Sequence, residues 1–177
     1  MLHTILLIMA LFEWIRNIFV TQRTIIGISA GTMRTIQNMA ENSHPDEFLA
    51  ILVTTPAEDL PISQSSGEVI TDLQVPPGAK SNKTSVRFND TYSPINNDTI
   101  GSVHSHPSGS QRPSQEDLSM FNKGVIHIII GAPYESNTWT AYDSNGTQVQ
   151  LDVVELSNYD TGKTPVEEDL EHINIDE

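Results

Sequence analysis

The chain has 177 residues, a length that allows one domain with a sizeable core but is short for two. It contains no cysteine, which excludes disulfide bonds and thiolate zinc sites, so any bound metal must use His, Asp, Glu or water as ligands. With 23 acidic and 9 basic residues the formal net charge is −14, which argues against general nucleic-acid binding because that function uses basic surfaces.

The first 22 residues form an apolar N-terminal segment. Glu13 and Arg16 interrupt its apolar run, and a membrane-spanning helix needs about 20 apolar residues. A secretory signal has a basic start and a small-residue cleavage site, and neither is clear here. The sequence leaves open an interfacial or core-packed helix, a membrane anchor within residues 1–20, and a later start such as Met9. We expect a cytoplasmic protein, with membrane contact through this segment left open.

From Arg23 onward the chain alternates between predicted strands and helices. Periodicity and composition predict helices over 30–42 and 114–121, and strands over 23–29, 48–54, 69–75, 85–88, 100–104 and 125–131. The segments 58–66 and 92–98 are polar or rich in turn residues and predict loops. The turn signal Ser144-Asn145-Gly146 predicts a hairpin of strands 138–143 and 149–156. The fold expected over residues 23–157 is a single α/β (α+β) domain, with a mixed, mainly antiparallel sheet flanked by at least two helices.

Residues 158–177 form an acidic C-terminal tail, in which Lys163 is the only Lys or Arg. A like-charge run of this kind is typical of a solvated tail, and a salt-adapted source would give the same balance. Lys80, Lys83 and Arg87 form a mild basic cluster, which we expect to be solvated.

The stretch 101–117, GSVHSHPSGSQRPSQED, has the composition of a catalytic zinc site. His104 and His106 are two positions apart, and in an extended segment such side chains point to the same face. Pro107 and Gly109 then turn the chain, and Asp117 falls in the first turn of the following helix. Two imidazoles and one carboxylate leave a fourth coordination position open, as catalytic zinc sites do.

Each part of this stretch also has a purely structural explanation. Ser114 and Asp117 fit a helix N-cap pattern with an acidic residue at the third helical position, and a His-x-His pair can be incidental. Their combination is less common by chance, and a capped helix would hold its metal ligand rigidly, so both roles can coexist. His127 lies in an apolar strand and predicts a core histidine, whereas His44, before a proline, predicts a structural or solvent-facing one.

A zinc hydrolase also needs a general base for the attacking water. Glu116 neighbours Asp117, but we expect it to point elsewhere on the helix. Glu47 stands at the head of an apolar run, where burial would raise its pKa and suit it to proton transfer. The spacing alone fits equally a surface acid that opens a helix or strand.

Taken together, Glu47, the HSHP at 104–107 and the SQED at 114–117 resemble the motif of the JAMM (MPN+) metalloproteases. That motif is a distant Glu, then His-Ser/Thr-His, seven residues and Ser-x-x-Asp; residues 107–113 are the seven here. The surrounding HPDEFLAILV and GSVHSHPSG resemble archaeal stand-alone members. The resemblance covers residues 24–156 and implies a JAB/MPN domain of cytidine-deaminase-like architecture.

The resemblance also implies a role for each residue of the motif. It implies one Zn²⁺ per chain, held by His104, His106 and Asp117. Glu47 would be the general acid/base acting on the zinc-bound water, and Ser114 would help to stabilise the oxyanion of the tetrahedral intermediate. Ser105 would order the histidine loop.

The implied reaction is hydrolysis of the amide or isopeptide bond after the C-terminal Gly-Gly of a ubiquitin-like modifier, in the manner of a desampylase. Lysine conjugates of small modifiers would be the partners, and the oligomeric state is left open. The alternatives are a peptidase that processes a sulfur-carrier precursor, a RadC-type protein, and a non-catalytic modifier-binding scaffold, although scaffolds usually lack one or more ligands. Residues 58–66 and the segment near Asn122 are candidates for loops that grip the substrate.

Overall fold

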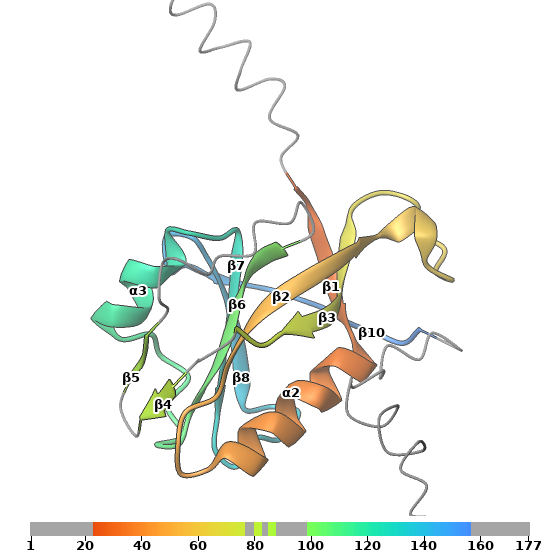
Figure 1. Ribbon diagram of the computed structural model, residues 1–177. Coiled ribbons are helices and arrows are strands. Elements are labelled where there is room, and N and C mark those ends of the chain that lie inside the picture. Colours follow the sequence, from red (N-terminus) through yellow and green to blue (C-terminus); the bar gives the residue numbers. More distant parts are fainter. Residues whose placement is uncertain (1–22, 77–79, 83–84, 88–98, 157–177) are drawn as a thin grey trace, which may run out of the picture.

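The computed structural model describes residues 23–76, 80–82, 85–87 and 99–156 (Figure 1). The predictions for the N-terminal segment 1–22, the turn-rich segment 92–98, Lys83 and the acidic tail 158–177 lie outside these residues. Nor are the side chains of Lys80 and Arg87 among those described. Within the described residues, no helix has the length and apolar character required to cross a membrane.

A mixed eight-stranded sheet forms the centre of the domain. The elements are β1 (Ile25–Ser29), α2 (Ala30–Ser43), β2 (Leu49–Pro56), η1 (Ala57–Asp59), β3 (Glu68–Gln74), β4 (Lys80–Asn82), β5 (Ser85–Arg87), β6 (Thr99–His106), α3 (Gln115–Phe121), β7 (Ile126–Gly131), β8 (Trp139–Asp143), β9 (Gln148–Val149) and β10 (Val153–Val154). The strand order is β10-β1-β3-β2-β6-β7-β8-β9, and β4 pairs with β5 apart from this sheet. Four neighbouring pairs of the large sheet are antiparallel and three are parallel, which confirms the predicted mixed, mainly antiparallel α+β fold.

Both faces of the sheet are covered, which explains the uninterrupted apolar sequence of β7. Met33 and Ile36 of α2 join a core cluster that contains Ile128. Ile129, the next residue, packs instead with Phe121 of α3 in a second cluster. Because successive side chains of a strand point to opposite faces, a strand between two helices must be apolar on both.

The predicted helix at 30–42 is confirmed as α2, and its end leads directly to Glu47. Ser29 caps the N-terminus, its side-chain oxygen accepting a hydrogen bond from the N–H of Thr32 at 2.9 Å. The helix ends at Ser43, because Pro45 disfavours the helical conformation in His44. The chain then turns and enters β2 two residues after Glu47.

The predicted hairpin at 138–156 is correct only in its first half. β8 pairs with β9 in antiparallel fashion across the predicted turn, but the expected single strand over 149–156 is wrong. The chain leaves β9 after Val149, and β10 pairs in parallel with β1 at the opposite end of the sheet, with Val153 beside Ile28. An apolar alternation predicts a strand but not its partner, and the edge of β1 offers unpaired backbone groups that β10 satisfies.

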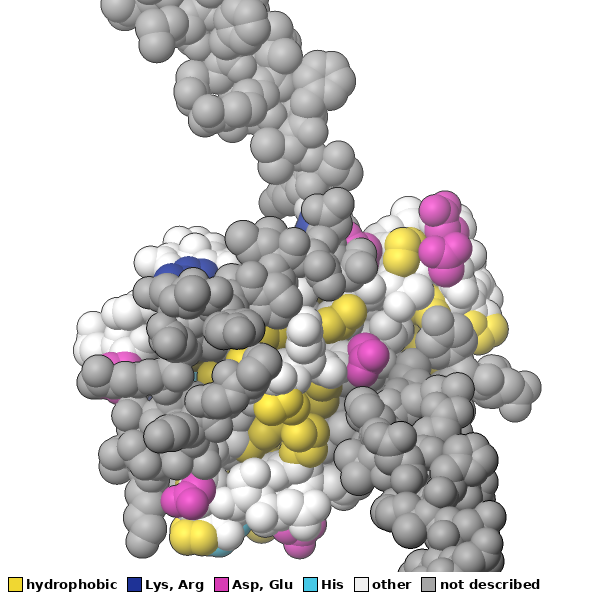
Figure 2. Space-filling view, viewed as in Figure 1, with side chains coloured by type: hydrophobic (Ala, Val, Ile, Leu, Met, Phe, Trp, Pro, Cys, Tyr) yellow, Lys and Arg dark blue, Asp and Glu magenta, His cyan; other side chains and the backbone are white. Residues whose placement is uncertain are grey.

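The predicted strands over 23–29, 48–54, 69–75, 85–88, 100–104 and 125–131 correspond to β1, β2, β3, β5, β6 and β7. β6 continues to His106, so both histidines of the motif lie on a regular strand. The short strand β4 was not predicted. On the face shown in Figure 2, the coloured Asp and Glu side chains occur at separate places, so the acidity of the described residues visible there is scattered.

Candidate metal centre

The register of β2 against β6 explains how Glu47 reaches the histidines. Leu49 pairs with His104 in this antiparallel ladder, and the N–H of Ser105 donates to the carbonyl of Phe48 at 2.9 Å. Continued by two residues from Leu49 and His104, the same register puts Glu47 opposite His106. Residues two apart on a strand share a face, so the side chains of Glu47 and Leu49 lie on the face of the histidine pair.

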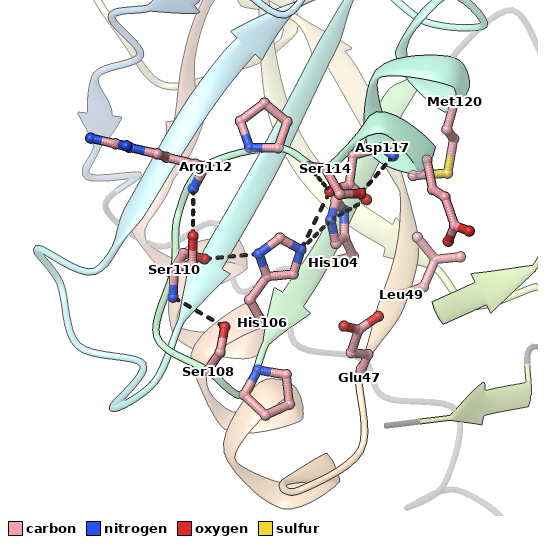
Figure 3. A pocket seen from close by; sticks show the side chains of 13 residues that line it. Glu47, Leu49, His104, His106, Ser108, Ser110, Arg112, Ser114, Asp117 and Met120 are labelled. Carbon is pink, nitrogen blue, oxygen red and sulfur yellow. Dashed lines mark hydrogen bonds and ion pairs between the residues drawn. The ribbon is translucent and has the colours of Figure 1, made fainter. Parts of the chain in front are cut away.

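Three side-chain ligand atoms converge at the end of β6 (Figure 3). The Nε2 atoms of His104 and His106 are 3.1 Å apart. Asp117 Oδ1 lies 3.1 Å from Nε2 of His104, and Asp117 Oδ2 lies 3.5 Å from Nε2 of His106. Ligands about 2.0–2.1 Å from a tetrahedral zinc ion are separated by about 3.3 Å. The donor set therefore fits a zinc ion in composition, and one ligand atom from each of the three residues lies within 4.8 Å of the others, with the two histidine nitrogens at a separation close to the tetrahedral value.

The tautomer of His106 suits metal binding. Its Nδ1 lies 2.8 Å from the carbonyl oxygen of Ser110. A carbonyl can only accept, so Nδ1 carries the proton and the lone pair of Nε2 faces the other two ligands. His104 has no such second contact: its buried Nδ1 has no hydrogen-bond partner among the described residues, so the polar contacts of this ring are those of its Nε2 with Asp117 and His106.

Helix α3 positions Asp117 through its own N-terminus. The N–H of Ser114 donates to Asp117 Oδ2 at 2.6 Å, and Ser114 Oγ accepts from the N–H of Asp117 at 3.1 Å, which completes a capping box. The N-cap interpretation of the sequence is therefore confirmed. It coexists with the candidate ligand role, because Oδ1 remains directed at His104 (Figure 3).

The loop between His106 and α3 is fastened to the sheet. Tyr142 donates its hydroxyl to the carbonyl of Gln111 at 2.7 Å, and Thr140 donates to the Gln111 side chain at 2.6 Å. Gly109, with φ of 80°, packs so closely on Gly131 that a Cβ on Gly131 would lie 2.5 Å from its carbonyl oxygen. These contacts hold the histidine strand and the Asp117 helix in one geometry.

Electrostatics distinguishes three ionisable groups of the site, Glu47, Asp117 and His106. Burial raises the pKa of Glu47, and the nearby charges of His106 and His104 only partly oppose it, as the sequence predicted. Burial acts in the same direction on Asp117, but hydrogen bonds to His104 and His106 outweigh it and hold its pKa far below the usual range. For His106, burial would lower the pKa, yet the contacts with Asp117 and the Ser110 carbonyl raise it. Asp117 is therefore the firmly ionised carboxylate, and Glu47 is the one suited to exchange a proton.

The ligands line a pocket of about 560 Å³. Glu47 and Ser114 lie on its wall, and the Glu47 carboxylate points into the same space as the histidines (Figure 3). Leu49 and Met120 supply apolar lining, and the guanidinium of Arg112 points away from the ligands. The structure thus brings together all five residues that the motif singled out: Glu47, His104, His106, Ser114 and Asp117.

Three expectations about the surroundings need correction or refinement. Glu116 also lines the pocket, because the first turn of α3 projects over it, so the expectation that it points elsewhere is wrong. Residues 58–66 follow the far end of β2, about 25 Å from Glu47 at 3.3 Å per residue, and do not line the pocket. Ser105 was expected to order the histidine loop. Its Oγ instead accepts a hydrogen bond from the N–H of Phe48 at 2.8 Å, so it holds the segment that carries Glu47.

Outside the pocket, the histidine predictions agree with the structure. His127 is buried, with Nδ1 at 2.9 Å from Ser102 Oγ and Nε2 at 2.9 Å from the carbonyl of Phe121. His44 is exposed and contacts the hydroxyl of Tyr134. The sequence did not single out Tyr134, which lies three residues after the end of β7, although the Pro-Tyr turn after an apolar run was a signal that could have found it.

Comparisons with known proteins agree with this geometry. Residues 29–142 match the family of prokaryotic homologs of the JAB domain. A Haloferax volcanii protein described as a probable metalloprotease is 35% identical over 133 residues, which are 75% of this chain and 82% of that protein. A solved structure described as a JAMM metalloprotease-like zinc site in the proteasome and signalosome is 36% identical, with a TM-score of 0.52 over 75% of this chain and 100% of the other. A JAB1/MPN domain protein from Archaeoglobus fulgidus gives 36% identity and a TM-score of 0.52 over 73% and 97% of the two chains.

Proposed function

The chain belongs to the prokaryotic JAB-domain family and is a metallopeptidase of the JAMM type, and from this premise we propose that it is a zinc isopeptidase. Its substrates would be lysine conjugates of small ubiquitin-like modifiers, cleaved after the C-terminal Gly-Gly. The observation that carries the proposal is the meeting of two imidazole nitrogens and a carboxylate within 3.1–3.5 Å. A second carboxylate, Glu47, lies in the same pocket, and burial raises its pKa.

The proposal assigns the metal to His104, His106 and Asp117, and the proton transfers to Glu47. When bound, zinc lowers the pKa of water and polarises the carbonyl group. Glu47 accepts one proton from the attacking water while the oxygen of that water forms a bond to the carbonyl carbon. Glu47 then returns this proton to the departing amine nitrogen as the C–N bond breaks, which releases a carboxylic acid and the lysine amine. A raised pKa suits both transfers, because the carboxyl group must take up the proton and release it again.

The proposal assigns to Ser114 the stabilisation of the negative charge that develops on the carbonyl oxygen. Its Oγ already accepts a hydrogen bond from the N–H of Asp117. The hydroxyl hydrogen is therefore available to donate into the pocket that Ser114 lines. A donor held in place by a helix cap needs little reorganisation when the charge forms, which is the basis of oxyanion stabilisation.

The test is cleavage of a modifier–lysine conjugate ending in Gly-Gly by zinc-loaded protein, with and without a chelator. We expect Glu47→Gln to keep its zinc and to lose at least about a hundredfold in kcat, the usual contribution of a general base. Glu155→Gln makes the same chemical change on a residue outside the pocket and should match the wild type. Absence of cleavage by zinc-loaded wild type on every Gly-Gly conjugate tried would refute the proposal.

The same site could cut a linear bond after Gly-Gly, as in the processing of a sulfur-carrier precursor. Parallel assays of a linear fusion and a lysine-branched conjugate of one modifier separate the two substrates. Faster cleavage of the branched conjugate supports the isopeptidase, and cleavage of the linear fusion alone supports precursor processing.

A further inference from the structure

A hydrogen-bonded pair, His44 and Tyr134, lies beside the segment that carries Glu47 and has no part in the reaction proposed above. His44 Nδ1 is 3.0 Å from the Tyr134 hydroxyl oxygen, and the two rings meet edge to face with centroids 6.0 Å apart. His44 follows α2 and Tyr134 follows β7, and Figure 1 shows the C-terminal end of α2 and the connection from β7 to β8 at the same lower edge of the molecule. The contact therefore joins the loop before β2 to the end of a central strand.

The backbone of Tyr134 is held in an unusual conformation. Its φ is 67°, and among the described residues it is the only non-glycine with a positive φ. Its N–H closes the turn by donating to the carbonyl of Gly131 at 2.9 Å, and the residue is 7% exposed. A bulky L-residue is strained in this region, and such strain concentrates at functional sites. A glycine or asparagine would close the turn at less cost, so the phenol itself must be what this position requires.

The N–H of Asp46 donates to the carbonyl of Ser43 at 2.8 Å within the turn after α2, and beyond this local bond the segment that carries Glu47 is attached to the rest of the domain on two sides. On one side, the N–H and carbonyl of Phe48 both bond to Ser105, the residue between the two histidines, at 2.8 and 2.9 Å. On the other side, His44 is held by Tyr134. The Glu47 carboxylate makes no hydrogen bond within the described part of the chain, so its location depends on the backbone between these two points. Burial and, after it, the charge of Glu47 raise the pKa of Tyr134, which agrees with a phenol close to the carboxylate.

We propose that His44 and Tyr134 are positioning residues that hold Glu47 at the histidine pair. The inference rests on the proposed function, because it treats Glu47 as the proton carrier. Neither side chain needs to touch the substrate: their hydrogen bond restricts the backbone on the N-terminal side of Glu47, as Ser105 does on the C-terminal side. Proton transfer depends steeply on the placement of the reacting groups. Loss of the bond between His44 and Tyr134 should therefore lower the turnover rate more than the affinity for the substrate.

The first test is kinetic. Tyr134→Phe removes only the hydroxyl, and we expect a kcat about fivefold lower, the equivalent of one hydrogen bond, with KM within about twofold and zinc content unchanged. His44→Ala should lose the same amount, and His44→Asn, whose amide can occupy the place of Nδ1, should recover most of it. Because one bond is involved, the His44→Ala/Tyr134→Phe double variant should lose no more than either single variant.

A matched control is Thr71→Val, which removes a buried hydroxyl that lies 2.6 Å from Thr55 Oγ1 on the neighbouring strand, away from the pocket. It should lower the melting temperature and leave kcat unchanged. Full kcat in Tyr134→Phe would overturn the inference, and so would losses that multiply in the double variant.

The second test does not use activity. Hydrogen exchange of the Asp46 and Phe48 amides should be faster in Tyr134→Phe than in the wild type, while exchange in β3 stays the same. If exchange accelerates but the wild type cleaves no conjugate, the positioning role stands and the proposed substrate class fails. If kcat falls while these amides exchange as in the wild type, Tyr134 does not act through the backbone and the inference is wrong.

Discussion

His127 makes folding stability depend on pH in a way that can be calculated. The residue is 2% exposed, and burial, partly offset by the hydrogen bond to the Phe121 carbonyl, lowers its pKa to about 4. In the unfolded chain a histidine has a pKa of about 6.5. Between these two values unfolding takes up a proton, so the folded state loses stability as the pH falls through this window. Above about pH 6.5 the ring is neutral in both states and has no such effect.

The size of the effect follows from the two pKa values. Each pKa unit corresponds to about 1.4 kcal/mol, so the His127 term reaches about 2 kcal/mol at pH 5 and about 3 kcal/mol at pH 4. The physical cause is geometric. Nε2 donates to the Phe121 carbonyl and Nδ1 accepts from the Ser102 hydroxyl, so a second ring proton would require Ser102 to reverse its hydrogen bond in a buried space.

The assay is urea unfolding followed by tryptophan fluorescence at pH 7.5 and pH 5, for the wild type and His127→Gln. The glutamine does not titrate, although its amide can still donate to Phe121. We expect the variant to be less stable at pH 7.5, and its deficit relative to the wild type to shrink by about 2 kcal/mol at pH 5. The candidate metal ligands are the same in both proteins, so their own titration cancels in this difference. Equal pH dependence in the two proteins, or a His127 pKa near 6.5 by NMR, would refute the reasoning.

The contacts of three further residues predict the effects of substituting them. A Cβ on Gly101 would lie 1.7 Å from the carbonyl oxygen of Ile126, so Gly101→Ala should break the pairing of β6 with β7. We expect the far-UV circular dichroism spectrum of an unfolded chain, or a melting temperature many degrees lower than that of the wild type. A wild-type melting temperature would contradict this. Ser105→Ala leaves the N–H of Phe48 without its buried acceptor and should cost about 1–3 kcal/mol of unfolding free energy in urea titrations, whereas Ser105→Thr should cost less. His104→Ala should reduce the zinc content, measured by plasma mass spectrometry, from about one per chain to none and abolish any thermal stabilisation by added zinc; retained stoichiometric zinc would exclude this site.

Much of this protein could be predicted from local sequence. The apolar period of 30–42 predicted α2, and the continuous apolar run at 125–131 predicted the buried strand β7. His104, His106 and Asp117 could be singled out because strand and helix periods put the two histidines on one face and Asp117 in the first helical turn. The roles of these residues, and those of Glu47 and Ser114, came from the resemblance to the JAMM motif. Each of these features depends on residues a few positions apart, whose relation is set by backbone geometry alone.

Other features exist only because distant segments meet. The sequence does not say that β10 leaves its hairpin to pair with β1, because an apolar alternation fits any free edge. Nor does it say that Glu116 lines the pocket, or that Tyr134, with no motif of its own, lies against His44. Even Glu47 owes its place to the register of β2 on β6, since a slip of one residue would turn its carboxylate to the opposite face. Local periodicity determined which side chains could serve the site, and the pairing of strands distant in sequence decided which of them face one another.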